Sequence, residues 1–245
     1  MIERLRERWR PGPVSRVDFL GVGAPRCGTT WAYKTLREHP DIQFPWRGEG
    51  HFWDSEYTGL DPEAEKAAYL ARFERPARPD QKWGDITPAY SRLPVDVVKR
   101  IHECAPDARV FFSLRSPLEQ YWSGTRRRYM LEHTEPASEK LEELMLKQLS
   151  KTKVTREGRF MTTIRIWRHV YGEEAVFVYL LDDAARDPVG TARKLCEHIG
   201  VSSQPAASMV PPSRVNQAPE APMPERAWEV GRDVFRPEVE ELSAL

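Results

Sequence analysis

Residues 19–31 join an apolar segment to a helical pattern through a glycine-containing turn, and they read Phe19-Leu20-Gly21-Val22-Gly23-Ala24-Pro25-Arg26-Cys27-Gly28-Thr29-Thr30-Trp31. Where a strand leads into a helix in this way, the N–H groups of the turn and of the first helical turn converge on one point. Such a point favours an anion, typically a phosphate. Gly23 and Gly28 have the spacing of a P-loop, but Thr29 stands where nucleotide triphosphatases place a lysine. The segment therefore predicts a phosphate-binding loop for a ligand other than ATP.

Apolar runs and helical patterns alternate along the rest of the chain. Runs rich in β-branched and aromatic residues predict strands at 17–22, 109–114 and 175–181, and weaker runs lie at 42–44 and 82–85. Because the strong runs are apolar throughout, we expect strands covered on both faces, as in a parallel sheet. Helical patterns occupy residues 29–38, 62–73, 94–104, 117–131, 138–149, 160–171 and 188–199. This order predicts an α/β fold of the P-loop NTPase-like kind, with a five-stranded parallel sheet flanked by helices.

A single domain that spans residues 1–245 is the simplest organisation for a chain of this length. We expect a core at 17–200, a proline-rich strap at 201–225 and a C-terminal helix at 226–245. The strap is expected to be irregular, because six prolines fall between Ser202 and Pro224 with little apolar periodicity.

The charge balance limits the classes of partner. The chain has 37 basic and 37 acidic side chains, whereas proteins that coat nucleic acids or adsorb to membranes carry a large basic excess. No apolar run approaches the ~20 residues that cross a bilayer, and the N-terminal residues lack the apolar stretch of a secretory signal. Three widely spaced cysteines suggest neither a disulfide framework nor a zinc site. We therefore expect a cytoplasmic protein with no nucleic-acid partner and no membrane partner.

A second candidate anion site follows the predicted strand at 109–114. Arg115 follows the carboxyl end of that strand, and its guanidinium can donate two hydrogen bonds to a phosphate. Ser123 on the next helix adds a hydroxyl group. Ligands of open parallel sheets bind at these carboxyl ends, so we expect this site and the glycine loop to face one crevice. Arg126, Arg127 and Arg128 follow on the same helix, either as a solvated basic face or as part of an anion-binding groove.

Both motifs resemble those of the sulfotransferases that use 3'-phosphoadenosine 5'-phosphosulfate (PAPS). Residues 25–31 are similar to the family's 5'-phosphosulfate loop, P-[KR]-[SCG]-G-T-T followed by an aromatic or apolar residue. Residues 115–123 are similar to its 3'-phosphate site, R-[DSN]-P with a serine eight positions after the arginine. The resemblance implies a PAPS-dependent sulfotransferase that uses no metal. It also implies the donor contacts, with the phosphosulfate on Arg26, Cys27, Gly28, Thr29 and Thr30, the adenine on Trp31, and the 3'-phosphate on Arg115 and Ser123.

The acceptor side is indicated by residues 46–54, which are similar to the K-E-x-H-F-F-D segment of glycan-type and many bacterial sulfotransferases. The glutamate of that pattern is the general base, so the resemblance gives this role to Glu49, with Gly48 in place of the usual lysine. His51 is the competing base, because imidazole titrates near neutrality. Residues 84–90 resemble the family's G-E-x-[ST]-P-x-Y segment, which implies that Asp85 and Tyr90 border the acceptor.

Sulfuryl transfer also needs positive charge at the departing phosphate, a role that the resemblance gives to Arg26. Ser213-Arg214-Val215-Asn216 is a candidate third donor contact, in place of the R-K-G segment of cytosolic sulfotransferases. The sequence leaves open the acceptor, a hydroxyl or amine of a small molecule, glycan or peptide, and also the oligomeric state. It leaves open two other classes of function, a P-loop kinase or nucleotide hydrolase and a non-catalytic binding module.

Overall fold

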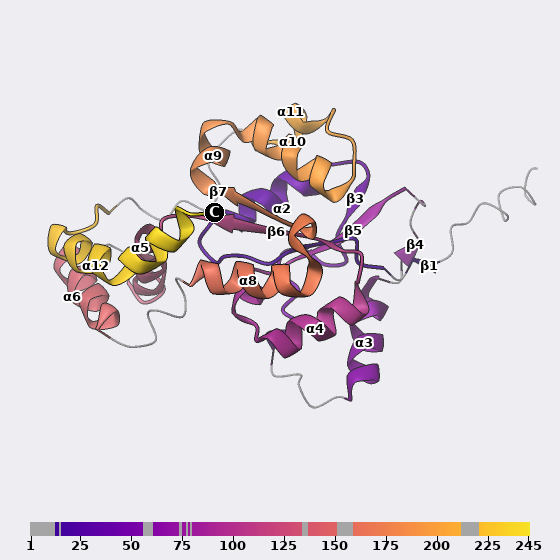
Figure 1. Ribbon diagram of the computed structural model, residues 1–245. Coiled ribbons are helices and arrows are strands. Elements are labelled where there is room, and N and C mark those ends of the chain that lie inside the picture. The colour runs from indigo at the N-terminus through magenta and orange to yellow at the C-terminus, as the bar shows by residue number, and fades with distance from the viewer. Residues whose placement is uncertain are drawn as a thin grey trace, which may run out of the picture.

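The computed structural model describes residues 13–14, 16–55, 61–73, 75–76, 78, 80–133, 137–150, 159–211 and 221–245. At its centre is a parallel sheet of five strands in the order β3-β5-β2-β6-β7, shown in Figure 1. The strands are β3 (Ile42–Gln43), β5 (Lys82–Ile86), β2 (Phe19–Gly21), β6 (Arg109–Leu114) and β7 (Val176–Leu180). A separate antiparallel pair joins β1 (Pro13–Val14) to β4 (Arg75–Pro76). The predicted fold class, an α/β domain with a parallel sheet flanked by helices, is confirmed.

Helices cover both faces of the sheet. Successive residues of a strand point to opposite faces, so each central strand contributes apolar side chains to both sides. On one face, Leu20 and Phe112 belong to the same apolar cluster as α4 (Val95–Cys104) and α8 (Phe160–Tyr171). On the other face, Phe19 and Phe111 share a cluster with α2 (Thr29–Arg37) and α10 (Pro188–Ile199). These four side chains are at most 1% exposed, so the sheet is the middle layer of the core (Figure 1). Shorter elements are α3 (Pro62–Leu70), η1 (Ala71–Phe73), η2 (Pro88–Arg92), η3 (Glu173–Ala175), α9 (Leu181–Arg186) and α11 (Ala206–Met209).

Prolines set several helix starts where the sequence predicts them. α3, α10 and α5 (Pro117–Tyr129) begin with a proline at the first position, where the missing N–H needs no partner. Asp61 and Asp187 cap α3 and α10 by accepting N–H bonds from the first turn. The predicted strand at 17–22 is shorter than expected, because only Phe19–Gly21 pair with both β5 and β6.

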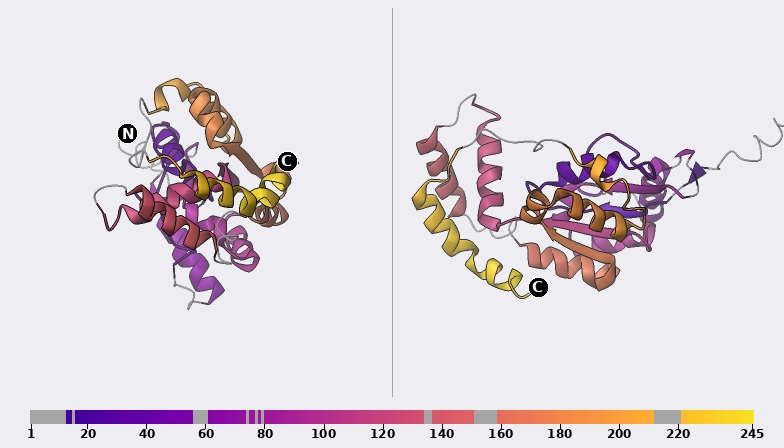
Figure 2. Two further views of the ribbon diagram at one scale, coloured as in Figure 1. Left: turned by 90° about the vertical axis from the view of Figure 1, so that its left-hand side faces the viewer. Right: turned by 90° about the horizontal axis from the view of Figure 1, so that it is seen from above.

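Three helices form a separate group beside the sheet, shown from two sides in Figure 2: α5, α6 (Ser138–Leu149) and α12 (Glu225–Leu242). Their apolar faces share one cluster, to which Trp122, Leu141 and Phe235 each contribute a buried side chain. α12 corresponds to the predicted C-terminal helix, whereas α11 shows that part of the predicted strap is helical rather than irregular. The candidate donor contact at 213–216 lies outside the described residues. Within the described ranges, no helix combines the length and the apolar character needed to span a bilayer.

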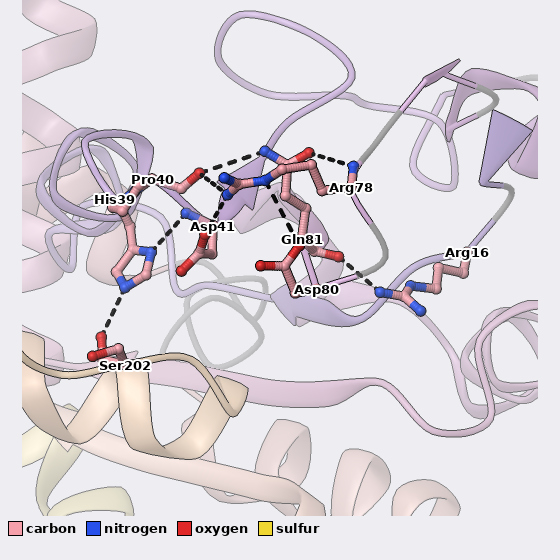
Figure 3. Close-up of polar contacts among 8 residues, drawn as sticks. All are labelled: Arg16, His39, Pro40, Asp41, Arg78, Asp80, Gln81 and Ser202. Atoms are coloured by element: carbon pink, nitrogen blue, oxygen red, sulfur yellow. Dashed lines mark hydrogen bonds and ion pairs between the residues drawn. The ribbon is translucent and has the colours of Figure 1, made fainter. Parts of the chain in front are cut away.

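A polar cluster joins the segment after α10 to the amino-terminal edge of the sheet, as Figure 3 shows. His39 is 2% exposed and accepts the Asp41 N–H at Nδ1 over 3.0 Å. Its Nε2 therefore carries the ring proton and donates it to the Ser202 carbonyl over 2.7 Å. Arg78 binds the Asp41 carboxylate and also donates to the Pro40 carbonyl over 3.3 Å. These bonds fix both nitrogens of His39, so this histidine is structural.

The carboxyl ends of the strands lie at the opposite edge. Thr87, which follows β5, donates its N–H to the Gly21 carbonyl over 3.0 Å. On the other side of β2, Ser113 of β6 donates its N–H to the Gly23 carbonyl over 2.7 Å. Because β2 lies between β5 and β6, the glycine loop, the segment after Thr87 and Arg115 all leave the sheet at one edge.

A buried carboxylate at the end of β5 organises this edge. The side chain of Asp85 is completely buried and accepts three hydrogen bonds, from Thr87 Oγ1 over 2.7 Å, Tyr90 OH over 2.8 Å and Tyr69 OH over 3.2 Å. Thr87 Oγ1 in turn accepts the N–H of Gly50 over 3.0 Å. Asp85 and Tyr90, expected either to border the acceptor or to form a packed turn, are 0% exposed and bonded to each other, which fits the packed turn. They hold the backbone between the two candidate bases against the sheet.

Gly84 is needed where β5 passes the ring of Phe19, since a Cβ at this position would lie 2.1 Å from that ring. Gly84→Ala should lower the free energy of unfolding by roughly 1–3 kcal/mol, because the buried ring has no room to move. Gly124→Ala in α5 is the control: nothing lies within 4 Å of the new Cβ. It should raise the free energy of unfolding by about 0.5–1 kcal/mol. Urea denaturation measures both effects, and a Gly84→Ala protein as stable as the wild type would contradict this packing.

Burial raises the pKa of Asp85 from its ordinary 3.8 to about 6, against the opposing effect of its hydrogen bonds. Since the folded protein holds this proton more tightly than the unfolded chain does, the stabilising contribution is complete below about pH 4 and is lost as the pH rises through 6. Asp85→Asn removes this titration. Between about pH 4 and pH 7.5 the wild type should therefore lose roughly 3 kcal/mol of stability relative to the variant. Chemical denaturation across this range tests the expectation, and a pH-independent difference would refute it.

Candidate active site

The glycine loop between β2 and α2 is held in place by hydrogen bonds that three of its carbonyl oxygens accept. The Ser113 N–H binds the Gly23 carbonyl, and the Ser113 hydroxyl binds the Cys27 carbonyl. From α5, Gln120 Nε2 donates to the Pro25 carbonyl over 2.9 Å. These three carbonyl oxygens therefore point into the protein. The loop thus turns its carbonyl oxygens away from the start of α2, where the positive end of the helix dipole favours an anion.

The loop has a positive φ at three positions, Gly23, Arg26 and Gly28. Arg26 has φ 66°, in the left-handed region that few non-glycine residues adopt. Gly28 has φ 85° and is the N-cap of α2, with Thr29 buried as the first helical residue and Thr30 half-buried after it. A Cβ on Gly28 would also lie 2.5 Å from Leu181 Cδ1 at the start of α9. The left-handed conformation thus favours glycine at position 28, whereas the Leu181 methyl group could move aside.

Arg26 lies within a group of arginines. Its Nε donates to Ser123 Oγ over 3.1 Å, so the two predicted anion sites are in direct contact. The pKa of Arg26 is lowered, first by burial and then by repulsion from Arg127, Arg115 and Arg126. Because like charges this close repel, a ligand with several negative charges would relieve the repulsion. The loop is therefore suited to a polyanion.

Arg115 follows the last residue of β6, as predicted. Its Nε donates to Glu119 Oε2 over 3.1 Å, within the first turn of α5. Its charge also acts on Cys27: burial raises the pKa of that thiol to about 12, while Arg115 and Arg26 act in the opposite direction. Cys27 is 0% exposed and therefore remains a neutral thiol. Arg115 thus acts electrostatically on the glycine loop.

Trp31 lies on the first turn of α2 and is half-buried. Its ring packs against Tyr179 of β7, with 6.5 Å between the ring centroids and an interplanar angle of 58°. The partly exposed ring thus adjoins the glycine loop at the carboxyl edge of the sheet.

Glu49 and His51 belong to the segment that Asp85 and Thr87 hold through Gly50. His51 Nε2 contacts Glu49 Oε2 over 2.9 Å, and His51 Nδ1 contacts the Asp54 carboxylate over 2.8 Å. The Asp54 contact is the main cause that raises the pKa of His51, with Glu49 adding to it. Two flanking carboxylates favour the protonated imidazolium, which has no free nitrogen to accept a proton. Glu49 is about half exposed, with a side-chain exposure of 45%.

Sequence reasoning missed two residues that shape the loop, Ser113 and Gln120. Ser113 is hidden within an apolar strand pattern, so nothing distinguished it. Gln120 carried a signal, because it lies three positions before Ser123 and therefore on the same face of α5. Among the residues that the structure describes, no three His, Cys, Asp or Glu side chains gather as a metal site.

The resemblance is supported by a solved structure and by a family model. A model of the sulfotransferase family matches residues 19–205. The crystal structure of a sulfotransferase from Alicyclobacillus acidocaldarius superposes with a TM-score of 0.67 and 26% sequence identity, over 94% of this chain and 96% of that one. No curated protein sequence matches significantly.

Two more distant structures share the fold. One is the sulfotransferase STF9 from Mycobacterium avium, with a TM-score of 0.57 and 15% identity over 93% of this chain and 77% of that one. The other is the sulfotransferase domain of the Synechococcus PCC 7002 olefin synthase, with a TM-score of 0.53 and 14% identity over 92% and 96%. Since the family model spans residues 19–205, well over half of the chain, this protein belongs to the sulfotransferase family and is a sulfotransferase.

Proposed function

We propose that the enzyme transfers a sulfuryl group from PAPS to a hydroxyl or amine of its acceptor. The observation that carries this proposal is the contact between the two anion-binding features, the Arg26–Ser123 bond beside Arg115. A nucleotide with phosphate groups at both the 3' and the 5' position matches two adjacent cationic sites. ATP carries no phosphate for the second site.

We assign the donor contacts as follows. The N–H groups of residues 27–30, at the positive end of α2, and the Arg26 guanidinium bind the 5'-phosphosulfate, for which the Cys27 N–H exchanges its bond to the Ala24 carbonyl. Arg115 and Ser123 bind the 3'-phosphate, for which Arg115 exchanges its bond to Glu119. Trp31 offers its exposed face to the adenine.

Glu49 is the proposed general base. It accepts the proton of the acceptor group while the acceptor oxygen or nitrogen attacks sulfur in line with the leaving group. The bond between sulfur and the bridging oxygen breaks, and adenosine 3',5'-bisphosphate leaves. Arg26 and the loop N–H groups stabilise the negative charge that develops on the bridging oxygen.

His51 is assigned a positioning role. Both ring nitrogens are engaged by carboxylates, so the imidazolium orients Glu49 rather than accepting a proton itself. The alternative of a P-loop kinase or nucleotide hydrolase is not favoured, because Thr29 occupies the position of the phosphate-binding lysine and the chain belongs to the sulfotransferase family.

Glu49→Gln should lower kcat by roughly 10²–10⁴-fold, because the amide cannot accept the proton. The Kd for adenosine 3',5'-bisphosphate should stay within about twofold, since Glu49 does not contact the donor in this assignment. Labelled PAPS with a panel of hydroxyl and amine acceptors measures turnover, and calorimetry measures binding. Glu38→Gln, an exposed glutamate at the far end of α2, is the control. Unchanged turnover in Glu49→Gln would remove it as the base, and a larger loss in His51→Gln would transfer the role to the imidazole.

Arg115→Ala should weaken binding of adenosine 3',5'-bisphosphate by about 10- to 100-fold, the loss expected for a charge-assisted phosphate contact. Binding of adenosine 5'-phosphosulfate, which lacks the 3'-phosphate, should change by no more than about twofold. Calorimetric titration of both ligands separates the two effects. Arg165→Ala, on the exposed side of α8, controls for the loss of one positive charge. Equal weakening of both ligands would show that Arg115 does not recognise the 3'-phosphate.

A further inference from the structure

Gln120 of α5 is a buried amide whose described contact is with the glycine loop. It is 6% exposed, and its Nε2 donates to the Pro25 carbonyl over 2.9 Å. Its Oε1 has no hydrogen-bond partner among the described residues. The desolvation of a buried amide costs free energy, and the bond to Pro25 offsets part of that cost. The influence of Gln120 is therefore exerted on the loop.

The direction of the Pro25 carbonyl fixes that of the next N–H group. The peptide bond from Pro25 to Arg26 is trans. In a planar trans peptide group the C=O and the following N–H point in opposite directions. The Arg26 N–H therefore points away from Gln120, and it has no hydrogen-bond acceptor within the part of the chain that the structure describes. Arg26 is half-buried, whereas Ala24 and Cys27 of the same loop are buried, so Arg26 lies on the more open side of the loop.

A second peptide group of the loop is held in the same way. Ser113 Oγ of β6 donates to the Cys27 carbonyl, and the peptide bond that follows is also trans. The Gly28 N–H therefore points away from Ser113, at the N-cap position of α2. Two N–H groups of the loop, two residues apart, are thus oriented by α5 and by β6 rather than by α2.

Arg26 is held by α5 at two points. Gln120 and Ser123 lie three positions apart and therefore on one face of this helix. Gln120 fixes the carbonyl that precedes Arg26, and Ser123 Oγ accepts a hydrogen bond from Arg26 Nε over 3.1 Å. Because one helix holds both its main chain and its side chain, Arg26 presents its N–H and its guanidinium in a fixed relation to each other.

We propose that Gln120 is a positioning residue for sulfuryl transfer. By holding the Pro25 carbonyl, it presents the Arg26 N–H to the 5'-phosphosulfate as a donor in addition to those at the start of α2. Negative charge grows on the bridging oxygen as its bond to sulfur breaks, so a fixed N–H stabilises the transition state and the leaving bisphosphate more than it stabilises bound PAPS. Gln120 itself touches neither donor nor acceptor. This inference rests on the proposed transfer from PAPS.

Gln120→Met removes the amide donor and keeps the length of the side chain. It should lower kcat by about 10- to 100-fold, because the Arg26 N–H remains but loses its fixed direction. The Kd for adenosine 3',5'-bisphosphate should rise about tenfold, and the Kd for adenosine 3'-monophosphate should stay within about twofold. The monophosphate uses Arg115 and Ser123 alone, so a general loosening of α5 would weaken its binding as well. Unchanged kcat, or equal weakening of the two nucleotides in calorimetry, would overturn the proposal.

Thr125→Val is the matched control. Thr125 is 1% exposed on α5, and its hydroxyl bonds to the Tyr121 carbonyl and to Gln148 Oε1 of α6. Like Gln120→Met, the change removes buried hydrogen bonding from α5, but none with the loop. It should lower Tm while kcat and both Kd values stay within about twofold. Thermal denaturation checks that each variant is folded. A loss of kcat as large as that in Gln120→Met would show that Gln120 has only a structural role.

Amide NMR locates the effect at single N–H groups. In wild-type ¹H–¹⁵N spectra, the amide protons of Arg26 and Gly28 should shift downfield when the bisphosphate binds, because charge-assisted hydrogen bonds form. Gln120→Met should reduce the shift at Arg26 by about half or more and leave the shift at Gly28. Ser113→Ala should give the reverse pattern. If the two amides respond alike in both variants, the assignment of one side chain to each N–H is wrong.

Inorganic pyrophosphate is a second probe that separates this inference from the proposed function. Suppose that the wild type binds no bisphosphate, but that pyrophosphate shifts the Arg26 amide and no longer does so in Gln120→Met. That result would refute PAPS as the donor and support the positioning role. Sulfuryl transfer from PAPS at an unchanged rate in Gln120→Met would refute the positioning role and leave the proposed function standing.

Discussion

The anion site depends on which way the peptide groups of one loop point. A short loop offers carbonyl oxygens as well as N–H groups, and an anion is repelled by the former as it is attracted by the latter. In this protein β6 and α5 take up the carbonyls of Gly23, Pro25 and Cys27. The partners of Cys27 and Pro25 lie 86 and 95 residues further along the chain. The loop therefore acquires its polarity from tertiary structure rather than from its own sequence.

The segment that carries Glu49 and His51 is held at the same edge of the sheet by a buried carboxylate. A carboxylate without water around it is costly to ionise, yet three hydroxyl groups are turned toward Asp85. Through Thr87 this network holds the N–H group of Gly50. The bond is to the main chain, so it does not involve the side chains of Glu49 and His51. The main chain between Glu49 and His51 is thus fixed in position, while their side chains contact each other and His51 also contacts Asp54.

Local patterns predicted much of this molecule, and long-range packing accounts for what they missed. The apolar runs at 109–114 and 175–181 and the proline-led helices were recognisable, because burial on both faces and the missing N–H of proline act within a few residues. The glycine loop and Arg115 were placed correctly at one edge, since all strands of a parallel sheet end there. The Arg26–Ser123 bond, the roles of Ser113 and Gln120 and the burial of Asp85 depend on residues far apart in the chain. Spacing within one segment carries no information on such contacts.

Much of the surface of α5 is covered by other elements. Gln120 and Ser123 face the glycine loop, Trp122 lies in the apolar cluster shared with α6 and α12, and Leu118 fits against Gly231 of α12, where a Cβ would lie 2.3 Å from it. Only Glu119, Arg127 and Arg128 of α5 are exposed, whereas Gln120, Trp122 and Ser123 are buried. Because each buried position meets a different neighbour, a substitution at one of them would disturb the glycine loop or the three-helix cluster. During evolutionary divergence, these α5 positions should therefore change slowly, while the exposed ones vary.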